Sequence, residues 1–177
     1  ADTWQTLGIS CRYRAHLRQL DALAAIPSVA DEFAERFGRH SGGLVRPYRT
    51  DGAETVVVAL GSVLGTLKDT VDALRADGVP VGVVGITTFR PFPYDALRAA
   101  VGGASRVVVL ERAFSVGTGG IVTADARAVL GDRELHTVVA GLGGRPVTEA
   151  SLHRLLSRVD DLEPLTFLDL NTELVES

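Results

Sequence analysis

Apolar, β-branched runs alternate with amphipathic segments from residue 55 onward. The runs are TVVVAL (55–60), VPVGVVGI (79–86), RVVVLE (106–111) and HTVVAG (136–141). Each run is apolar on both faces and therefore predicts a buried strand of a parallel sheet. Apolar residues at helical spacing fill the intervals, at 64–74, 93–101, 121–130 and 148–159. This alternation with short connections predicts a three-layer α/β/α domain.

The N-terminal quarter of the chain follows a different pattern. Residues 1–11 show no clear period, whereas residues 12–25 place Tyr13, Leu17 and Leu20 on one helical face. Pro27 predicts a break there, followed by a second short helix over 29–37 with Ser28 as its N-cap. We therefore expect residues 1–43 to form a helical connector and residues 44–177 to form the α/β domain.

Two short segments flank the alternating part. LVRPY (44–48) predicts a strand, which Pro47 would confine to an edge of the sheet because proline cannot donate to a neighbouring strand. TFLDL (166–170) fits either a last short strand or a docked tail.

Composition and charge narrow the class of protein. The 177 residues are 46% hydrophobic and 23% charged, as in ordinary globular proteins. The net charge of −4 argues against sequence-independent binding of nucleic acid, which needs a dense basic face. No apolar run reaches the roughly 18 residues of a membrane span, and no signal peptide opens the sequence, so we expect no membrane contact and a cytoplasmic location. The absence of methionine suggests a processed chain or a piece of a longer one.

Metal and nucleophile chemistry finds little support in the sequence. Cys11 is the only cysteine, so it cannot build an iron–sulfur cluster or a thiolate zinc site by itself. The four histidines are dispersed without ligand spacing. No serine stands in a nucleophile elbow, and no pair of acid–base carboxylates can be singled out. We therefore predict no metal ligand and no catalytic residue.

Three glycine-rich turns follow the predicted strands, where ligands bind in open α/β sheets. GSVLGT (61–66) lacks the glycine spacing and the lysine of a phosphate loop, and Ser62 can cap the next helix alone, so a simple turn is favoured over an anion site. SVGTGG offers Gly117, Gly119 and Gly120 as an anion nest, with close packing as the alternative. In GLGGRPVT, Arg145 could grip an anion, but a salt bridge to Glu111 or another carboxylate is favoured.

The fourth turn, TTFRPFP (87–93), is aromatic instead of glycine-rich. It places Arg90 between Phe89 and Phe92, and an arginine beside rigid aromatic rings is typical of protein interfaces. Phe114, in the neighbouring turn, joins this predicted interface. The alternative is that these phenylalanines belong to the core.

The quoted segments together resemble a known family. The stretch from TVVVAL to RPFP, followed by VVVLERAFSVGTGG and GLGGRPVTEASL, resembles the second domain of the alpha subunit of pyruvate:ferredoxin oxidoreductase and related 2-oxoacid:ferredoxin oxidoreductases. Residues 12–49 resemble the connector that precedes this domain. The resemblance implies a fold similar to the C-terminal domain of transketolase: a mostly parallel five-stranded sheet whose first strand is antiparallel.

The resemblance also implies a role. These enzymes oxidise pyruvate or another 2-oxoacid with coenzyme A, use thiamine diphosphate, and pass electrons through iron–sulfur clusters to ferredoxin. The family binds thiamine diphosphate in other domains, so we expect no cofactor in this domain and no activity from it alone. We expect an assembly domain that contacts other domains or subunits and forms homodimeric contacts. The alternative is a module that binds an anion, coenzyme A or a nucleotide at the carboxyl edge of the sheet.

Overall fold

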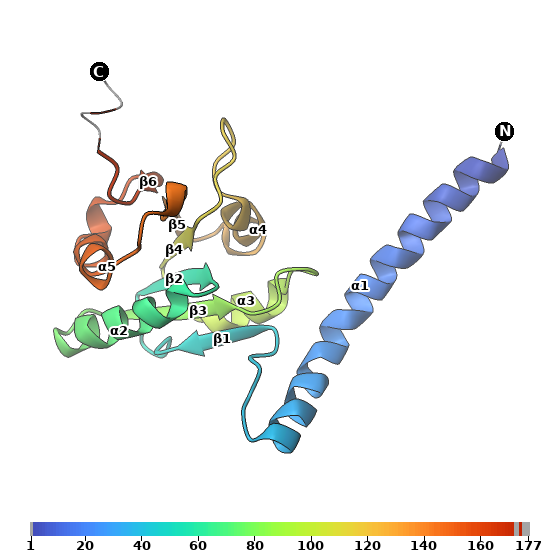
Figure 1. Cartoon of the computed structure of the whole chain (residues 1–177), viewed down its shortest axis with the longest axis horizontal. Helices are drawn as coiled ribbons and strands as arrows, with labels where there is room; N and C mark the ends of the chain where they lie inside the picture. Colours follow the sequence, from blue (N-terminus) through green and yellow to red (C-terminus); the bar gives the residue numbers. More distant parts are fainter. Residues whose placement is uncertain (1, 172–173, 175–177) are drawn as a thin grey trace.

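The computed structural model of the chain describes residues 2–171 and 174, with side chains from residue 7 onward. Its centre is a six-stranded sheet in the order β1-β3-β2-β4-β5-β6 (Figure 1). The strands are β1 (Val45–Tyr48), β2 (Thr55–Leu60), β3 (Val81–Ile86), β4 (Arg106–Glu111), β5 (Glu134–Val139) and β6 (Leu165–Phe167). The helices are α1 (Asp2–Phe37), α2 (Val63–Ala76), α3 (Tyr94–Val101), α4 (Ile121–Leu130) and α5 (Glu149–Leu156), with 3₁₀ turns η1 (Leu142–Gly144) and η2 (Val159–Asp161).

The sheet is parallel except at one edge. β1 pairs antiparallel with β3, which confirms the predicted edge strand around Pro47. The prediction of five strands is wrong by one, because β6 pairs in parallel with β5. The backbone amide of Thr137 donates to the carbonyl of Pro164, so β6 satisfies hydrogen-bonding groups that β5 would otherwise leave free at an edge. Of the two interpretations of TFLDL (166–170), the strand is confirmed for its first two residues, and the chain turns after Phe167.

Helices cover both faces of the sheet, as predicted. Successive residues of β2 alternate between the two cores, because side chains of a strand point to opposite faces in turn. Val56 and Val58 pack with Leu97 of α3 on one face, whereas Val57 and Ala59 pack toward α2 and α5 on the other. The core residues of β2 are essentially inaccessible to solvent. Burial on both faces is the physical reason for the continuous apolar runs in the sequence.

The N-terminal segment corrects one prediction. Instead of two helices separated at Pro27, residues 2–37 form the single helix α1. Proline removes one backbone donor, but here the helix is largely exposed and water can hydrate the carbonyl that loses its partner. Ser28 does not act as an N-cap, since its hydroxyl donates to the carbonyl of Ala25 at 2.8 Å. Gly38 ends the helix with a positive φ of 65°, as its position predicts.

The starts of α5 and α2 differ, although a residue that favours the N-cap position precedes each helix. Thr148 caps α5, and its hydroxyl accepts a hydrogen bond from the amide of Ser151 at 3.1 Å. Ser62 stands at the cap position of α2 but makes no side-chain cap hydrogen bond. Its backbone is helical instead of extended, and this differs from the conformation that an N-cap side chain requires.

Candidate functional site at the carboxyl edge of the sheet

The sheet has a topological switch point between β2 and β4, where the strand order reverses. β3 lies on one side of β2 and β4 lies on the other, so the connections from β2 and β4 diverge. Such a switch point is where open α/β sheets bind ligands. A cavity of about 420 Å³ opens there. Its apolar lining includes Leu60, Phe89, Leu110, Ile121 and Val122, and its polar lining includes Ser62, Glu111 and Arg112.

Apolar side chains dominate the surface around this cavity. Leu60, Phe89 and Ile121 are each more than one third exposed, although all three are large and apolar. Val116, in the neighbouring hairpin, is 88% exposed. Clustered exposed apolar residues mark interaction sites more often than single ones do. The edge therefore offers a contact surface of apolar character.

Glu111, the last residue of β4, is the buried acid of the site. Its carboxylate accepts hydrogen bonds from the amide of Val122 at 2.8 Å and from the amide of Thr123 at 3.0 Å. The hydroxyl of Thr123 donates a third bond at 2.7 Å. The N-terminus of α4 has free amides and a partial positive charge, and Glu111 satisfies both. An external anion at this helix would have to displace a carboxylate of the protein itself.

The SVGTGG turn owes its glycines to packing and to backbone conformation. A Cβ atom at Gly120 would lie 1.9 Å from Oε1 of Glu111, so only glycine fits beside this carboxylate. Gly117 and Gly119 have positive φ angles of 78° and 108°, which side chains disfavour. Ser115 and Gly119 exchange two backbone hydrogen bonds of 2.8 Å, which close a tight hairpin between β4 and α4 that extends from the domain (Figure 1).

The arginines of these turns have partners within the chain. Arg145 donates to the main-chain carbonyl of Asp169, and among the described residues it pairs neither with Glu111 nor with another carboxylate. Nη2 of Arg90 contacts the carboxylate of Asp125 at 2.8 Å, and its guanidinium lies 4.0 Å from the ring centre of Phe89. Nε of Arg112 donates to the carbonyl of Gly141 at 3.0 Å. An anion site at Arg145 and the glycines stays a prediction, since the geometry supplies a structural role for each.

The structure separates the four residues of the predicted interface. Phe89 and Arg90 lie on the surface beside the cavity, whereas Phe92 is buried in the core. Phe114 packs against Phe167 of β6 with ring centres 5.0 Å apart. The sequence reasoning missed Leu60, which precedes Gly61 at the end of β2, and Ile121, which follows Gly120 at the start of α4. An apolar residue next to a loop glycine at the carboxyl edge is the signal that could have found them.

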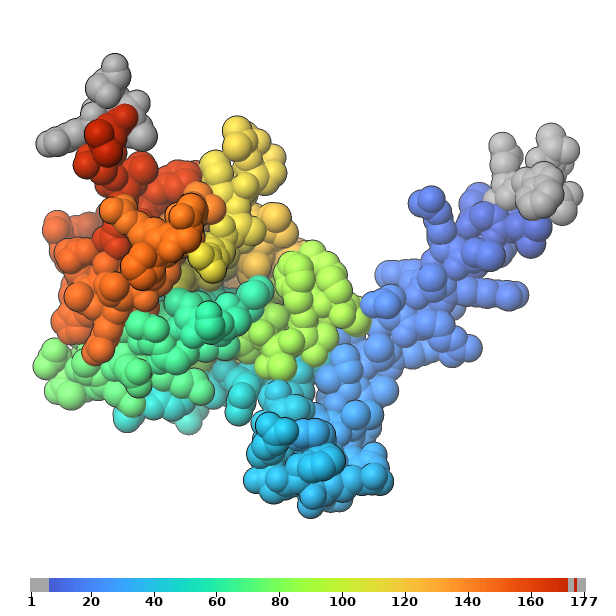
Figure 2. Space-filling model, viewed as in Figure 1, coloured from blue at the N-terminus to red at the C-terminus, as the bar shows by residue number. Residues whose placement is uncertain are grey.

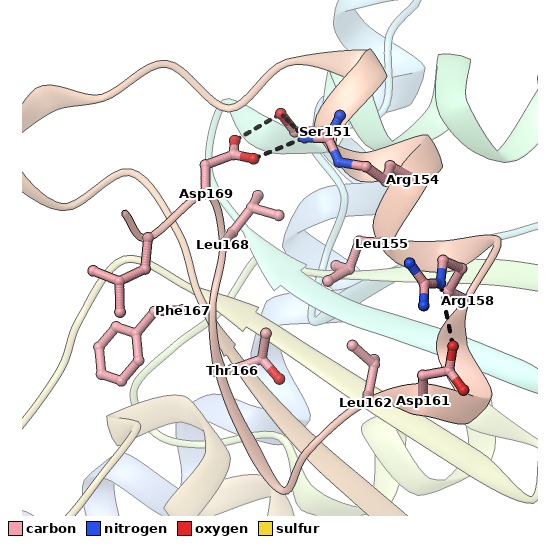
Figure 3. Close-up of a pocket in the computed structure, with 11 residues that line it drawn as sticks. Ser151, Arg154, Leu155, Arg158, Asp161, Leu162, Thr166, Phe167, Leu168 and Asp169 are labelled. Atoms are coloured by element: carbon pink, nitrogen blue, oxygen red, sulfur yellow. Dashed lines mark hydrogen bonds and ion pairs between the residues drawn. The ribbon is translucent and has the colours of Figure 1, made fainter. Parts of the chain in front are cut away.

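A second hollow, of about 400 Å³, lies between α5 and the C-terminal segment (Figure 3). Asp169 accepts a hydrogen bond from the hydroxyl of Ser151 at 2.6 Å and pairs with Arg154 at 2.9 Å. Arg158 pairs with Asp161 at 3.2 Å. The contacts of Asp169 with Ser151 and Arg154 hold the C-terminal segment against α5. Because Arg154 and Arg158 each pair with a carboxylate of the chain, neither offers an unpaired charge to a ligand.

The described residues contain no group of three or more histidine, cysteine or carboxylate side chains that could hold a metal ion. Cys11 is exposed on α1. Among the described helices, none is both long enough and apolar enough to cross a membrane.

Known proteins share sequence with this chain. Residues 53–152 match the family model described as pyruvate:ferredoxin oxidoreductase core domain II. The chain is 36% identical over 166 residues to the pyruvate synthase subunit PorA of Methanothermobacter thermautotrophicus, covering 93% of this chain and 43% of that one. It is 40% identical over 159 residues to PorA of Thermotoga maritima, covering 82% and 39%. The chain thus spans less than half the length of these relatives.

A solved structure agrees with the fold. The 2-oxoglutarate:ferredoxin oxidoreductase from Magnetococcus marinus superposes with a TM-score of 0.53 over 71% of this chain and 20% of that one. Its sequence is 20% identical, so this similarity concerns the fold alone.

Proposed function

The chain belongs to the pyruvate:ferredoxin oxidoreductase core domain II family, and we propose that it is an assembly domain of a 2-oxoacid:ferredoxin oxidoreductase alpha subunit. In this role the carboxyl edge of the sheet binds another domain or subunit of the enzyme, or the same surface of a second copy. Pyruvate is the substrate we propose for the complete enzyme, because the PorA relatives are subunits of pyruvate synthases.

The observation that carries this proposal is the chemistry of the carboxyl edge. Catalytic groups in α/β enzymes are polar side chains that keep a free hydrogen-bonding position toward the substrate. Here the acid of the edge, Glu111, accepts three bonds from α4, and Arg90, Arg112 and Arg145 each bind an acceptor of the chain. Beside these groups, Leu60, Phe89 and Ile121 are exposed. An apolar surface whose charged groups are hydrogen-bonded within the chain fits a protein partner.

The cofactors of the complete enzyme fit poorly on these residues. One exposed cysteine cannot hold an iron–sulfur cluster, and the described residues form no cluster of acidic or histidine side chains for the metal ion of a diphosphate. We propose that thiamine diphosphate and the clusters are bound outside this chain. No catalytic step is assigned to its residues, and we expect no 2-oxoacid oxidation from the chain alone.

A chimera tests the assembly role. The matching segment of PorA from Thermotoga maritima is replaced by this chain, and assembly with the companion subunits is followed by gel filtration and native mass spectrometry. Ile121→Glu places a charge in the apolar surface and should abolish assembly. Leu165→Glu is the matched control: Leu165 is 39% exposed, compared with 44% for Ile121, but lies at the start of β6. Normal assembly of the Ile121→Glu chimera would refute the proposed surface.

A second candidate function is favoured by the cavity at the switch point. Its volume of about 420 Å³ and the nearby Arg112 would suit a small ligand that has an apolar part and an anionic group. Calorimetric titration of the chain with coenzyme A, thiamine diphosphate and inorganic phosphate decides this. Heat that saturates with one of them and is lost in Arg112→Ala would establish the binding module, and flat traces with all three would remove it.

A further inference from the structure

The N-terminal half of α1 is an exposed helix. Residues 7–21 are exposed except Ser10, which is half-buried, whereas farther along the helix Ala30 is buried, with only 4% of its surface exposed. Figure 2 shows α1 leaving the body of the protein, with an open angle between its N-terminal half and the domain. An isolated helix in water gains little from its own backbone hydrogen bonds, and helices in proteins are stabilised mainly by packing one face.

This half of α1 carries an apolar stripe. Ile9, Tyr13, Leu17 and Leu20 are exposed to 71%, 61%, 41% and 45%. With about 100° of rotation per residue, the four side chains fall within an arc of about 80°. The stripe begins where the helix leaves the domain, since Leu20 and Leu23 line a shared hollow with Arg90 and Phe92. The stripe therefore continues a packed surface into solvent.

Charge distinguishes between partners for the stripe. Residues 3–20 contain three arginines and no carboxylate, although the whole chain has a net charge of −4. On the helix, Arg12 and Arg14 lie about 100° to either side of the centre of the stripe. A narrow apolar seam with charges along both margins is the arrangement by which helices select partners of opposite charge.

A second copy of the helix is disfavoured by this charge pattern. Antiparallel pairing would place Arg12 of both copies along one margin and Arg14 of both copies along the other, and parallel pairing would place Arg12 of one copy beside Arg14 of the other. Like charges that face each other across an interface oppose association. A lipid surface is disfavoured by the narrowness of the stripe, because interfacial helices bury a broad apolar face.

We propose that the N-terminal half of α1 is a docking surface for an acidic, amphipathic segment of a partner protein. The apolar seam of Ile9, Tyr13, Leu17 and Leu20 binds the apolar face of that segment. Arg12 and Arg14 bind carboxylates along its two margins. The inference rests on the proposed assembly role for the class of partner, but it concerns a surface separate from the carboxyl edge.

The test uses the whole chain and two labelled peptides. One is a 21-residue amphipathic peptide with leucine at helical spacing and glutamate elsewhere, and the other has lysine in place of glutamate. Fluorescence anisotropy gives Kd at low and high NaCl. We expect the acidic peptide to bind at least about tenfold more tightly than the basic one, and to weaken about tenfold as salt screens the charges.

Variants connect the binding to the residues named. Arg12→Glu/Arg14→Glu should weaken binding of the acidic peptide about tenfold or more, because the two arginines that attract its glutamates are replaced by carboxylates that repel them. Tyr13→Ser/Leu17→Ser should weaken binding of the acidic peptide by a similar factor, and equally at low and high salt, because the substitutions remove apolar contact area and no charge. Arg98→Glu/Arg158→Glu reverses two exposed charges outside α1 and should leave Kd unchanged. Circular dichroism establishes that each variant retains the helix.

Several results would overturn the inference. These are equal or absent binding of both peptides, dimerisation in sedimentation experiments that Tyr13→Ser/Leu17→Ser abolishes, or binding to phosphatidylglycerol vesicles without binding of the acidic peptide. The assembly chimera distinguishes the two proposals. Assembly through Ile121 without peptide binding refutes only the docking surface, and peptide binding without assembly refutes only the proposed function.

Discussion

Glu111 provides a direct test of the structural role assigned to the carboxyl edge. It is 5% exposed, and its carboxylate accepts two backbone amides and one hydroxyl at the start of α4. If Glu111 holds α4 in place, its removal should destabilise the fold. If it were instead a group kept for a ligand, its neutralisation would cost little stability, because functional sites give up stability for function.

The magnitude follows from the three hydrogen bonds. A buried donor left without an acceptor costs about 1–3 kcal/mol. The interaction of a carboxylate with a helix N-terminus contributes about 0.3–1 kcal/mol more, and up to about 2 kcal/mol in partly buried geometry. Glu111→Ala leaves three donors without their acceptor: the amides of Val122 and Thr123 and the hydroxyl of Thr123. Water in the cavity can replace the carboxylate at the donors that lie beside it. We therefore expect a loss of about 3–4 kcal/mol of the free energy of unfolding. Glu111→Gln retains one acceptor oxygen and should cost about 2 kcal/mol.

Urea denaturation at pH 7, followed by circular dichroism, measures both losses as shifts of the midpoint at constant slope. Glu149→Gln is the matched control, since Glu149 also lies in the first turn of a helix but is exposed. Its cost should stay below about 0.5 kcal/mol. Gly120→Ala should reproduce the loss of Glu111, because the new Cβ would lie 1.9 Å from Oε1 and displace the carboxylate. A loss below about 0.5 kcal/mol for Glu111→Gln would refute the reasoning.

Two further predictions concern helix caps and pH. Thr148→Ala should cost about 1 kcal/mol in urea denaturation, because it removes the acceptor of the Ser151 amide; Ser62→Ala should be nearly neutral, and equal costs would contradict the structure. The hydrogen bond from His136, and then Arg106, lowers the pKa of Glu134 below its ordinary value of 4.5. The stabilisation from Glu134 is therefore present above about pH 4.5 and is lost as the pH falls through the lowered folded-state pKa. The difference in the free energy of unfolding between wild type and Glu134→Gln, measured by urea denaturation, should shrink as the pH falls below about 4.5. A difference that stays constant between about pH 3 and pH 6 would exclude the effect.

The central strands were predictable because one physical constraint governs their whole length. Every position from Val56 to Ala59 is buried, so each must be apolar, and the run shows directly in the sequence. Helix starts were less predictable, since Thr148 and Ser62 are both good capping residues and only backbone conformation distinguishes them. The path of α1 through Pro27 could not be read from the sequence, because it depends on exposure and on the hydroxyl of Ser28.

The candidate site was predictable in position but only partly in chemistry. The rule for parallel sheets placed the important loops at the carboxyl ends of the strands. The sequence could not show that Glu111 reaches the amides of Val122 and Thr123, because that contact depends on how α4 packs against β4. Nor could it show that Phe92 is buried while Phe89 is exposed, although both belong to the same turn.

The state of Glu111 explains why an apolar partner suits this edge better than an anion. The N-terminus of α4 lies beside glycines and beside the cavity, which would otherwise favour phosphate. A phosphate bound there would have to expel the carboxylate of Glu111 from three hydrogen bonds into water, or share the site with it. In the first case the gain from the new anion is offset by the bonds that are lost, and in the second case two negative charges repel each other in a partly buried site. An apolar side chain beside Leu60 and Ile121 meets neither cost and displaces only water. The same carboxylate that stabilises the fold therefore directs the edge toward protein contacts.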